Sequence, residues 1–144
     1  MAPYEDLRAD ETTLPVISGR AAVLGAGPTG PLDGWEAGAA VYGVLVAGHG
    51  FGAGDPGAAG ILRRRGVAAV IAPSFAPRFL RHATACGLPA LVIEEAPAIQ
   101  TGDRLRVDVE AHVVANLSSG DRYVVRNIDD AELVVLRRTV AAAA

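Results

Sequence analysis

The sequence predicts an α/β fold in which buried parallel strands alternate with short helices and then give way to antiparallel hairpins. Of its 144 residues 51% are hydrophobic and 20% charged, a balance that suits one compact domain and excludes general disorder. Aromatic residues make up only 5%, whereas 17 Gly and 9 Pro favour many tight turns. The core is therefore expected to consist of aliphatic side chains, as in a sheet-based domain.

The first half of the chain carries the parallel part of the predicted sheet. A polar arm, residues 1–14, starts the single domain that we expect over residues 1–144. A first strand, interrupted by Gly19, is predicted over residues 16–24, and three apolar runs of strand length follow: residues 41–47, 67–72 and 88–93. A helix ending at Arg65 and a second helix over residues 74–86 separate the later runs, and a glycine follows each of them. Strands that alternate with helices and are apolar throughout indicate a parallel sheet.

The second half shows a different pattern. Three runs, separated by turn sequences, predict antiparallel hairpins: residues 104–109, 112–117 and 122–126. Asp129 followed by Glu132 resembles a capping box and predicts a last helix, with Leu133, Val134 and Leu136 as its apolar residues.

Composition and charge argue against several classes of function. A net charge of −3 gives no electrostatic reason to bind nucleic acid or an anionic membrane, so neither is expected as a partner. No apolar run is long enough to span a bilayer, and the start of the chain is acidic and polar, so we expect a cytoplasmic protein. Cys86 is the single cysteine, and the three histidines are scattered, so no metal site and no cofactor of the chain's own are expected.

Two glycine-rich segments that follow predicted strands are the candidate walls of a ligand pocket. Residues 25–38 contain five Gly and two Pro around Trp35, which suits a lid or binding loop. Residues 48–57 form the second segment, after the strand predicted over residues 41–47. Ligands of parallel sheets bind at the carboxyl ends of the strands, so we expect a small-molecule substrate between the two segments.

His49 and Asp55 in the second segment are the candidate catalytic residues. A neutral imidazole at position 49 could transfer a proton or donate a hydrogen bond to a carbonyl, and a packed or surface histidine is the alternative. Asp55 could orient a substrate. Because Pro56 follows it, Asp55 could instead cap the next helix.

Four further residues are candidates for substrate binding. Trp35, Tyr42 and Phe51 could form apolar walls of the pocket, with core packing as the alternative for Phe51. Ser74 could contact the substrate or simply cap the helix that follows it.

Parts of the chain resemble a known family, the small subunit of isopropylmalate dehydratase, which is similar to the swivelling domain of aconitases. The resemblance rests on VAGHGFGAG at residues 46–54 and GVAAVIAPSFAPRFLRHATACGLPAL at residues 66–91, and more weakly on residues 102–114 and 130–138. It implies a swivelling β/β/α domain, in which a small parallel-sheet unit is joined to an irregular β barrel. It also implies a large hydro-lyase subunit as partner, which carries an iron–sulfur cluster.

The chain departs from the family at the residues that bind substrate. In the family, the phenylalanine–glycine turn runs into a Ser-Ser-Arg-Glu-His stretch that holds a substrate carboxylate, whereas this chain continues from Phe51 as Phe-Gly-Ala-Gly-Asp-Pro-Gly-Ala-Ala. An Asn-Thr-Asp run of the family is also missing after the first strand. Losing one partner of a buried charge pair costs about 2–5 kcal/mol, so the substrate class is expected to differ.

Two interpretations of function remain. We prefer a stand-alone cyclase or isomerase of specialised metabolism that orders a neutral or apolar substrate in the loop-lined pocket without a cofactor. The alternative is a divergent small subunit of an isopropylmalate-dehydratase-like hydro-lyase that docks on an iron–sulfur large subunit. A homo-oligomer is left open in both cases.

Overall fold

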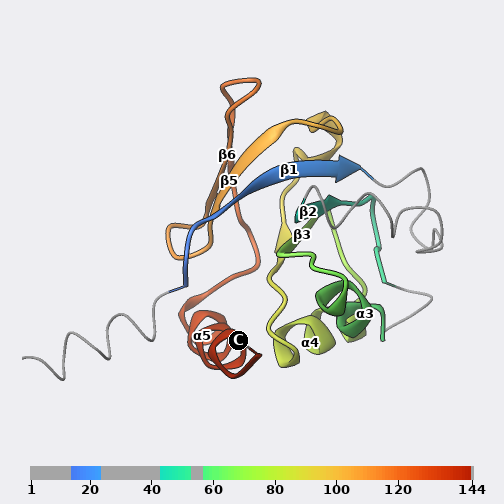
Figure 1. Ribbon diagram of the computed structural model, residues 1–144, viewed down its shortest axis with the longest axis vertical. Helices are drawn as coiled ribbons and strands as arrows, with labels where there is room; N and C mark the ends of the chain where they lie inside the picture. Colours follow the sequence, from blue (N-terminus) through green and yellow to red (C-terminus); the bar gives the residue numbers. More distant parts are fainter. Residues whose placement is uncertain (1–13, 24–42, 53–56, 144) are drawn as a thin grey trace, which may run out of the picture.

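The computed structural model describes residues 14–23, 43–52 and 57–143, which form one seven-stranded sheet curled into a half-barrel with three helices beside it (Figure 1). Strand order across the sheet is β4-β3-β2-β1-β5-β6-β7. The predicted α/β class, with a parallel unit joined to a barrel-like antiparallel unit, is confirmed. No helix in these ranges is long and apolar enough to cross a membrane.

The parallel half contains the strands that the apolar runs predicted. Its elements are β1 (Ile17–Val23), β2 (Gly43–Val46), α3 (Ala58–Arg64), β3 (Ala69–Ala72), α4 (Pro77–Ala85) and β4 (Ala90–Val92). β1 pairs with β2, β2 with β3 and β3 with β4, all in parallel. All four residues of β3 are buried, as expected for a strand covered on both faces. The short helix η1 (Ala96–Ala98) follows β4.

The antiparallel half continues the same sheet from β1. It contains β5 (Arg104–Asp108), β6 (Val113–Asn116) and β7 (Arg122–Val124), followed by α5 (Asp130–Ala143). β5 alternates strictly between exposed and buried residues up to Val107, so one face of this half packs on the core and the other faces solvent. β5 pairs with β6 and β6 with β7, both antiparallel, so the predicted hairpins are confirmed.

The two faces of the sheet carry separate hydrophobic cores. On one face, α3 and α4 cover the parallel half, and Leu45, Leu62 and Phe79 are among the buried side chains. The opposite, concave face is filled by residues of both halves and by Leu133 and Leu136 of α5. In α5 the predicted apolar face includes these two leucines, whereas Val134 is 42% exposed.

Some element boundaries differ from the prediction. Helix α3 begins at Ala58 after Gly57, two residues later than the Asp55–Pro56 pair indicated. Helix α4 begins at Pro77, because Ser74 and Phe75 are engaged with the turn that follows β2.

Asp129 caps α5 as expected, and its Oδ1 accepts a hydrogen bond from the Glu132 N–H at 2.8 Å. The Glu132 side chain instead accepts a hydrogen bond from Thr84 on α4.

A side-chain amide links the last part of the chain to the edge strand β4. Asn127 Oδ1 accepts the Val92 N–H at 2.9 Å, and its Nδ2 donates to the Ala90 carbonyl at the same distance. The Arg126 N–H also donates to the Val92 carbonyl. Asn127 thus provides the donor and the acceptor of a neighbouring strand and protects an otherwise unpaired edge.

One ion pair joins three distant segments. Arg137 of α5 donates from Nη2 to Glu110 Oε1 at 2.5 Å and from Nε to Oε2 at 2.9 Å, and Oε2 also accepts the Leu14 N–H at 2.8 Å. Glu110 lies between β5 and β6, and Leu14 precedes β1. The hydrogen bond from Arg137 lowers the pKa of Glu110 below its ordinary value, and the hydrogen bond from Leu14 acts in the same direction.

This pair predicts a specific dependence of stability on acid. A carboxyl whose pKa is lowered in the folded state stabilises the fold above its ordinary pKa, here 4.5, and loses this contribution as pH falls through the lowered value. Glu110→Gln should therefore lower the melting temperature at pH 7 and flatten its decrease below about pH 4.5. Glu94→Gln is the control, because the Glu94–Arg126 pair is separated by 3.8 Å and well exposed. Equal acid profiles for the wild type and Glu110→Gln would contradict the assignment.

Candidate functional site

The structure brings three of the predicted site residues, His49, Phe51 and Ser74, together at the carboxyl edge of the parallel strands. The β2 turn, which we define as residues 48–52, follows β2, and Ser74 follows β3. Ser74 Oγ accepts the Gly50 N–H at 2.8 Å and lies 3.4 Å from His49 Nδ1. Because this Oγ already accepts one hydrogen bond, its own proton is available to His49 Nδ1 when the imidazole carries its proton on Nε2.

The backbone fixes the β2 turn against the segment before α4. The Phe51 N–H donates to the Ser74 carbonyl at 3.3 Å, and the Ala76 N–H donates to the Phe51 carbonyl at 2.9 Å. Phe51 and Phe75 thereby form an isolated parallel bridge. His49 itself is exposed, so its ring is held on one side by Ser74 and is accessible to solvent. This arrangement suits a group that donates a hydrogen bond or transfers a proton to a ligand at the surface.

Phe51 lies below the turn in an aromatic cluster. It is 3% exposed and packs edge-to-face on Phe79, with ring centroids 5.1 Å apart, and on Phe75 at 6.3 Å. The rings of Phe75 and Phe79 stack at 5.6 Å. Such pairs stabilise a core beyond the area they bury. These contacts support core packing, the alternative given for Phe51, and its contact with substrate stays a prediction.

Gly52, the last residue of the β2 turn, packs closely against Phe79 of this cluster. Its φ of +91° lies in the region that side chains rarely adopt, and a Cβ built on it would lie 2.4 Å from Phe79 Cβ and 2.5 Å from Phe79 Cγ. The position therefore requires glycine for two reasons: its backbone conformation and its close approach to Phe79.

Ser74 is not the cap of the following helix. The N-cap of α4 is Ala76, which makes no side-chain capping hydrogen bond. The hydroxyl of Ser74 serves the β2 turn instead, 24 residues earlier in the chain. Sequence reasoning missed this pairing, since nothing in the local pattern distinguishes a serine that caps a helix from one that bonds to a distant turn.

The remaining candidates, Trp35, Tyr42 and Asp55, lie outside the described residues, and so does the loop over residues 25–38. The pocket expected between that loop and the second glycine-rich segment therefore stays a prediction. Among the described residues, hollows lie elsewhere: one of about 160 Å³ beside Leu14 and Val140, and one of about 480 Å³ between α4 and α5. Neither is lined by His49, Phe51 or Ser74.

The hydrogen bond to Gly50 can be tested at the amide itself. Ser74→Ala removes the acceptor, so we expect the Gly50 amide to exchange about tenfold faster with deuterium and the free energy of unfolding to fall by about 1 kcal/mol. Ser118→Ala is a matched control, because Ser118 Oγ accepts a backbone N–H from Arg104 at 2.9 Å in the antiparallel half. It should leave Gly50 exchange unchanged. Unchanged exchange in Ser74→Ala would contradict the geometry of the turn.

The single cysteine of the sequence does not fit an iron–sulfur cluster held by this chain, and the part of the chain that the structure describes shows no other metal centre. Within the described ranges, no group of three or more His, Cys, Asp and Glu side chains is arranged to hold a metal ion. The full sequence has one cysteine, Cys86, and burial raises the pKa of its thiol. A cluster that needs three or four thiolates would have to be held by another protein.

The curled sheet and its fixed turn define an α/β domain in which a parallel unit is joined to an antiparallel half-barrel, and the comparisons with known proteins agree. No family model matches the chain. It is 39% identical over 119 residues to the 3-isopropylmalate dehydratase small subunit of Pyrobaculum neutrophilum, which covers 81% of this chain and 74% of the relative. The chain belongs to the family of 3-isopropylmalate dehydratase small subunits.

Other relatives show how far the similarity extends. The small subunit 1 of Thermotoga maritima is 40% identical over 82 residues, and the match spans about half of that relative, 49%. A crystal structure of 3-isopropylmalate dehydratase from Methanocaldococcus jannaschii has the same fold, with a TM-score of 0.66 over 89% of each chain and 22% identity.

These findings correct our preferred interpretation of function. Nothing in the comparisons supports a repurposed cyclase or isomerase, and the alternative, an isopropylmalate-dehydratase-like small subunit, is the better supported one. The preference rested on the missing Ser-Ser-Arg-Glu-His stretch, which is a local feature of one segment. Identity spread over 119 residues outweighs it.

Proposed function

We propose that this chain is the small subunit of a hydro-lyase and that it assembles with a large subunit carrying an iron–sulfur cluster. The observation that carries the proposal is the 39% identity over 119 residues to a protein named 3-isopropylmalate dehydratase small subunit. In such an assembly the cluster would be held by the partner, because this chain has a single cysteine.

The β2 turn is the part of the chain that would face the shared site. It lies at the carboxyl edge of the parallel strands, where ligands of such sheets bind. His49 is exposed there, and Ser74 holds both its ring and the Gly50 N–H. A hydro-lyase breaks or forms a C–O bond and must move protons to and from the leaving or entering water. His49 is our candidate for one of these proton transfers, with Ser74 as the positioning residue.

This chain lacks the family's Ser-Ser-Arg-Glu-His stretch, so the carboxylates of a substrate would have to be bound by other positively charged groups. The amino end of α4 lies two residues after Phe75, beside the β2 turn, and the dipole of the helix weakly favours an anion there. This contribution is small, so the main contacts to carboxylates would come from the large subunit. We take a hydroxy acid of the 3-isopropylmalate type as the substrate class.

Co-purification tests the assembly. The large subunit of the same organism, carrying an affinity tag, is co-expressed with this chain. The molar mass of the affinity-purified material is then measured by light scattering. We expect a stoichiometric complex that survives gel filtration. A large subunit that elutes without this chain, while both proteins are folded, would contradict the proposal.

The role of His49 is tested in the same complex. His49→Ala should leave the mass of the complex unchanged and lower kcat by about 10²–10⁴-fold, the usual contribution of a general acid or base. His82→Ala is the control, since His82 is an exposed residue of α4. Equal kcat values for both variants would show that His49 transfers no proton in the reaction.

A further inference from the structure

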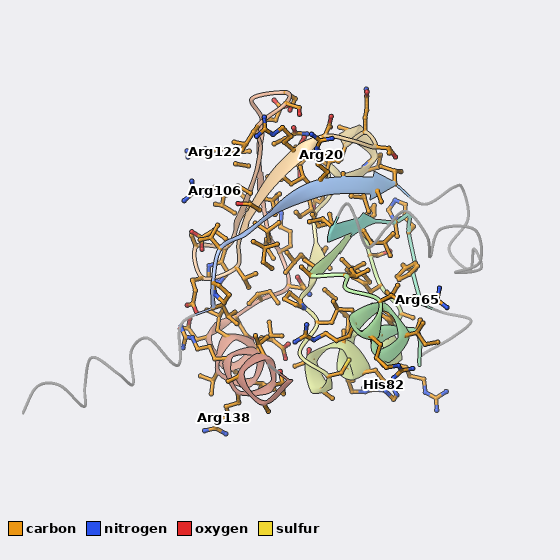
Figure 2. All side chains as sticks on the ribbon, in the orientation of Figure 1. Arg20, Arg65, His82, Arg106, Arg122 and Arg138 are labelled. Atoms are coloured by element: carbon orange, nitrogen blue, oxygen red, sulfur yellow. The ribbon has the colours of Figure 1, made fainter. Side chains whose placement is uncertain are left out.

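One face of the antiparallel half of the sheet is exposed and rich in arginine. Helices α3 and α4 cover one face of the parallel half, and the same face is exposed along β1, β5, β6 and β7. The register places Arg20 opposite Arg104, and Arg106 opposite Ala115, which in turn pairs with Arg122. We call the exposed residues Arg20, Arg104, Arg106 and Arg122 the arginine face. In Figure 2, Arg106 and Arg122 project together from the same side of the sheet.

The charge on this face differs from that of the rest of the chain. The whole sequence has more acidic than basic residues, 16 against 13, yet the arginine face shares its strands with only one acidic residue, Asp108. Asp108 Oδ1 accepts the Ala111 N–H at 3.1 Å. The ion pairs identified among the described residues involve Arg126 and Arg137 instead. Two like charges directly opposite on neighbouring strands, as Arg20 and Arg104 are, destabilise a sheet.

The size of the face indicates an extended partner. β1 and β7 are separated by β5 and β6, so Arg20 and Arg122 are about 14 Å apart across the sheet at the usual strand spacing. A single small anion cannot span that distance. A surface with several carboxylates can.

Apolar side chains on the same face favour a protein as the partner. Val124 pairs with Val113 and is 53% exposed, and Leu117, whose N–H donates to the Arg104 carbonyl, is 61% exposed. Apolar side chains beside arginines match the composition of protein interfaces. They would gain little against a phosphate backbone, and the net charge of −3 opposes a polyanion at longer range.

We propose that the arginine face docks on an acidic surface of the large subunit, with Leu117 and Val124 buried beside the arginines. The inference rests on the proposed function for the identity of the partner and adds the surface and its charge. It lies apart from the β2 turn, so changes on this face need not disturb His49 or Ser74.

The proposal is tested by reversing two charges on the arginine face and comparing the effect on binding with that of two reversals elsewhere on the chain. Arg106→Glu/Arg122→Glu is compared with Arg81→Glu/Arg138→Glu, whose arginines are exposed on α4, beyond its first turn, and on α5, and whose net charge change is the same. Binding to the large subunit is measured by interferometry at low and at moderate salt. We expect the first pair to weaken binding on the order of tenfold at low salt, mainly through the association rate, and the control by less than about twofold. Arg106→Gln/Arg122→Gln should give an intermediate loss.

Each other outcome overturns the proposal in a recognisable way. Equal effects of the two reversed pairs would show that only net charge matters. If the wild type binds the large subunit and no arginine variant changes the affinity, the docking surface is wrong and the proposed function stands. If the wild type does not bind the large subunit at all, both the docking surface and the proposed function are wrong. Binding of a mixed-sequence RNA or DNA oligonucleotide that Arg106→Glu/Arg122→Glu abolishes would show that the face serves nucleic acid.

Discussion

Gly52→Ala is expected to lower the free energy of unfolding by about 2–5 kcal/mol. The backbone at this position has φ +91°, which costs a side chain about 1–2 kcal/mol. The added methyl group would also meet the Cβ and Cγ of Phe79 at 2.4 and 2.5 Å, and Phe79 is fully buried between Phe51 and Phe75. Since the ring cannot move away without disturbing the cluster, overpacking adds a further 1–3 kcal/mol or so. Urea unfolding followed by circular dichroism measures the change.

Two other glycines separate the backbone effect from the clash. A Cβ at Gly48, in the same turn, meets nothing within 4 Å and has no positive φ, so Gly48→Ala should be close to neutral. Gly120 has φ +85° and open space, so Gly120→Ala should show the backbone cost alone. Similar losses for Gly52→Ala and Gly120→Ala would show that Phe79 is not in close contact with the turn.

Asn127→Asp is expected to cost about 2–3 kcal/mol at pH 7. The carboxylate can still accept the Val92 N–H, but it cannot donate to the Ala90 carbonyl, which accepts the Asn127 amide at 2.9 Å. A buried acceptor is then left unpaired, with a negative charge facing it. Thermal unfolding at pH 7, monitored by near-ultraviolet circular dichroism, measures the loss.

The pH dependence distinguishes this cause from general damage. A protonated carboxyl can again donate to the Ala90 carbonyl, so the introduced group should have a pKa above the ordinary value for Asp, about 3.9. A raised pKa in the folded state means that stability is gained as pH falls. The deficit of Asn127→Asp relative to wild type should therefore shrink between pH 7 and about pH 4. A constant deficit would contradict the paired hydrogen bonds at β4.

Local pattern was sufficient to predict most of the fold. Continuous apolar runs became the parallel strands β2 to β4, and alternating residues such as those of β5 became the half-exposed antiparallel sheet. Boundaries were less predictable, because they depend on distant contacts. Ser74 looks like the start of a helix, but its hydroxyl accepts the Gly50 N–H and the helix begins only at Pro77.

The candidate site was predictable only in part, since proximity in space has no local signature. His49 and Ser74 were singled out separately, and the structure places them 3.4 Å apart. The structural roles of Phe79 and Asn127 were missed, because each contacts residues more than 20 positions away. The arginine face depends on strand register: Arg20 and Arg104 are 84 positions apart in sequence and become neighbours only through the pairing of β1 with β5.

The most direct test of the small-subunit role is reconstitution of activity from separate proteins. The large subunit of the same organism, with its cluster intact, is assayed for dehydration of 3-isopropylmalate by the ultraviolet absorbance of the unsaturated product, alone and with increasing amounts of this chain. We expect little turnover from either protein alone and a rate that rises and saturates at a one-to-one ratio. A large subunit whose activity is the same with and without this chain, under conditions where an authentic small subunit of another species restores it, would contradict the assignment.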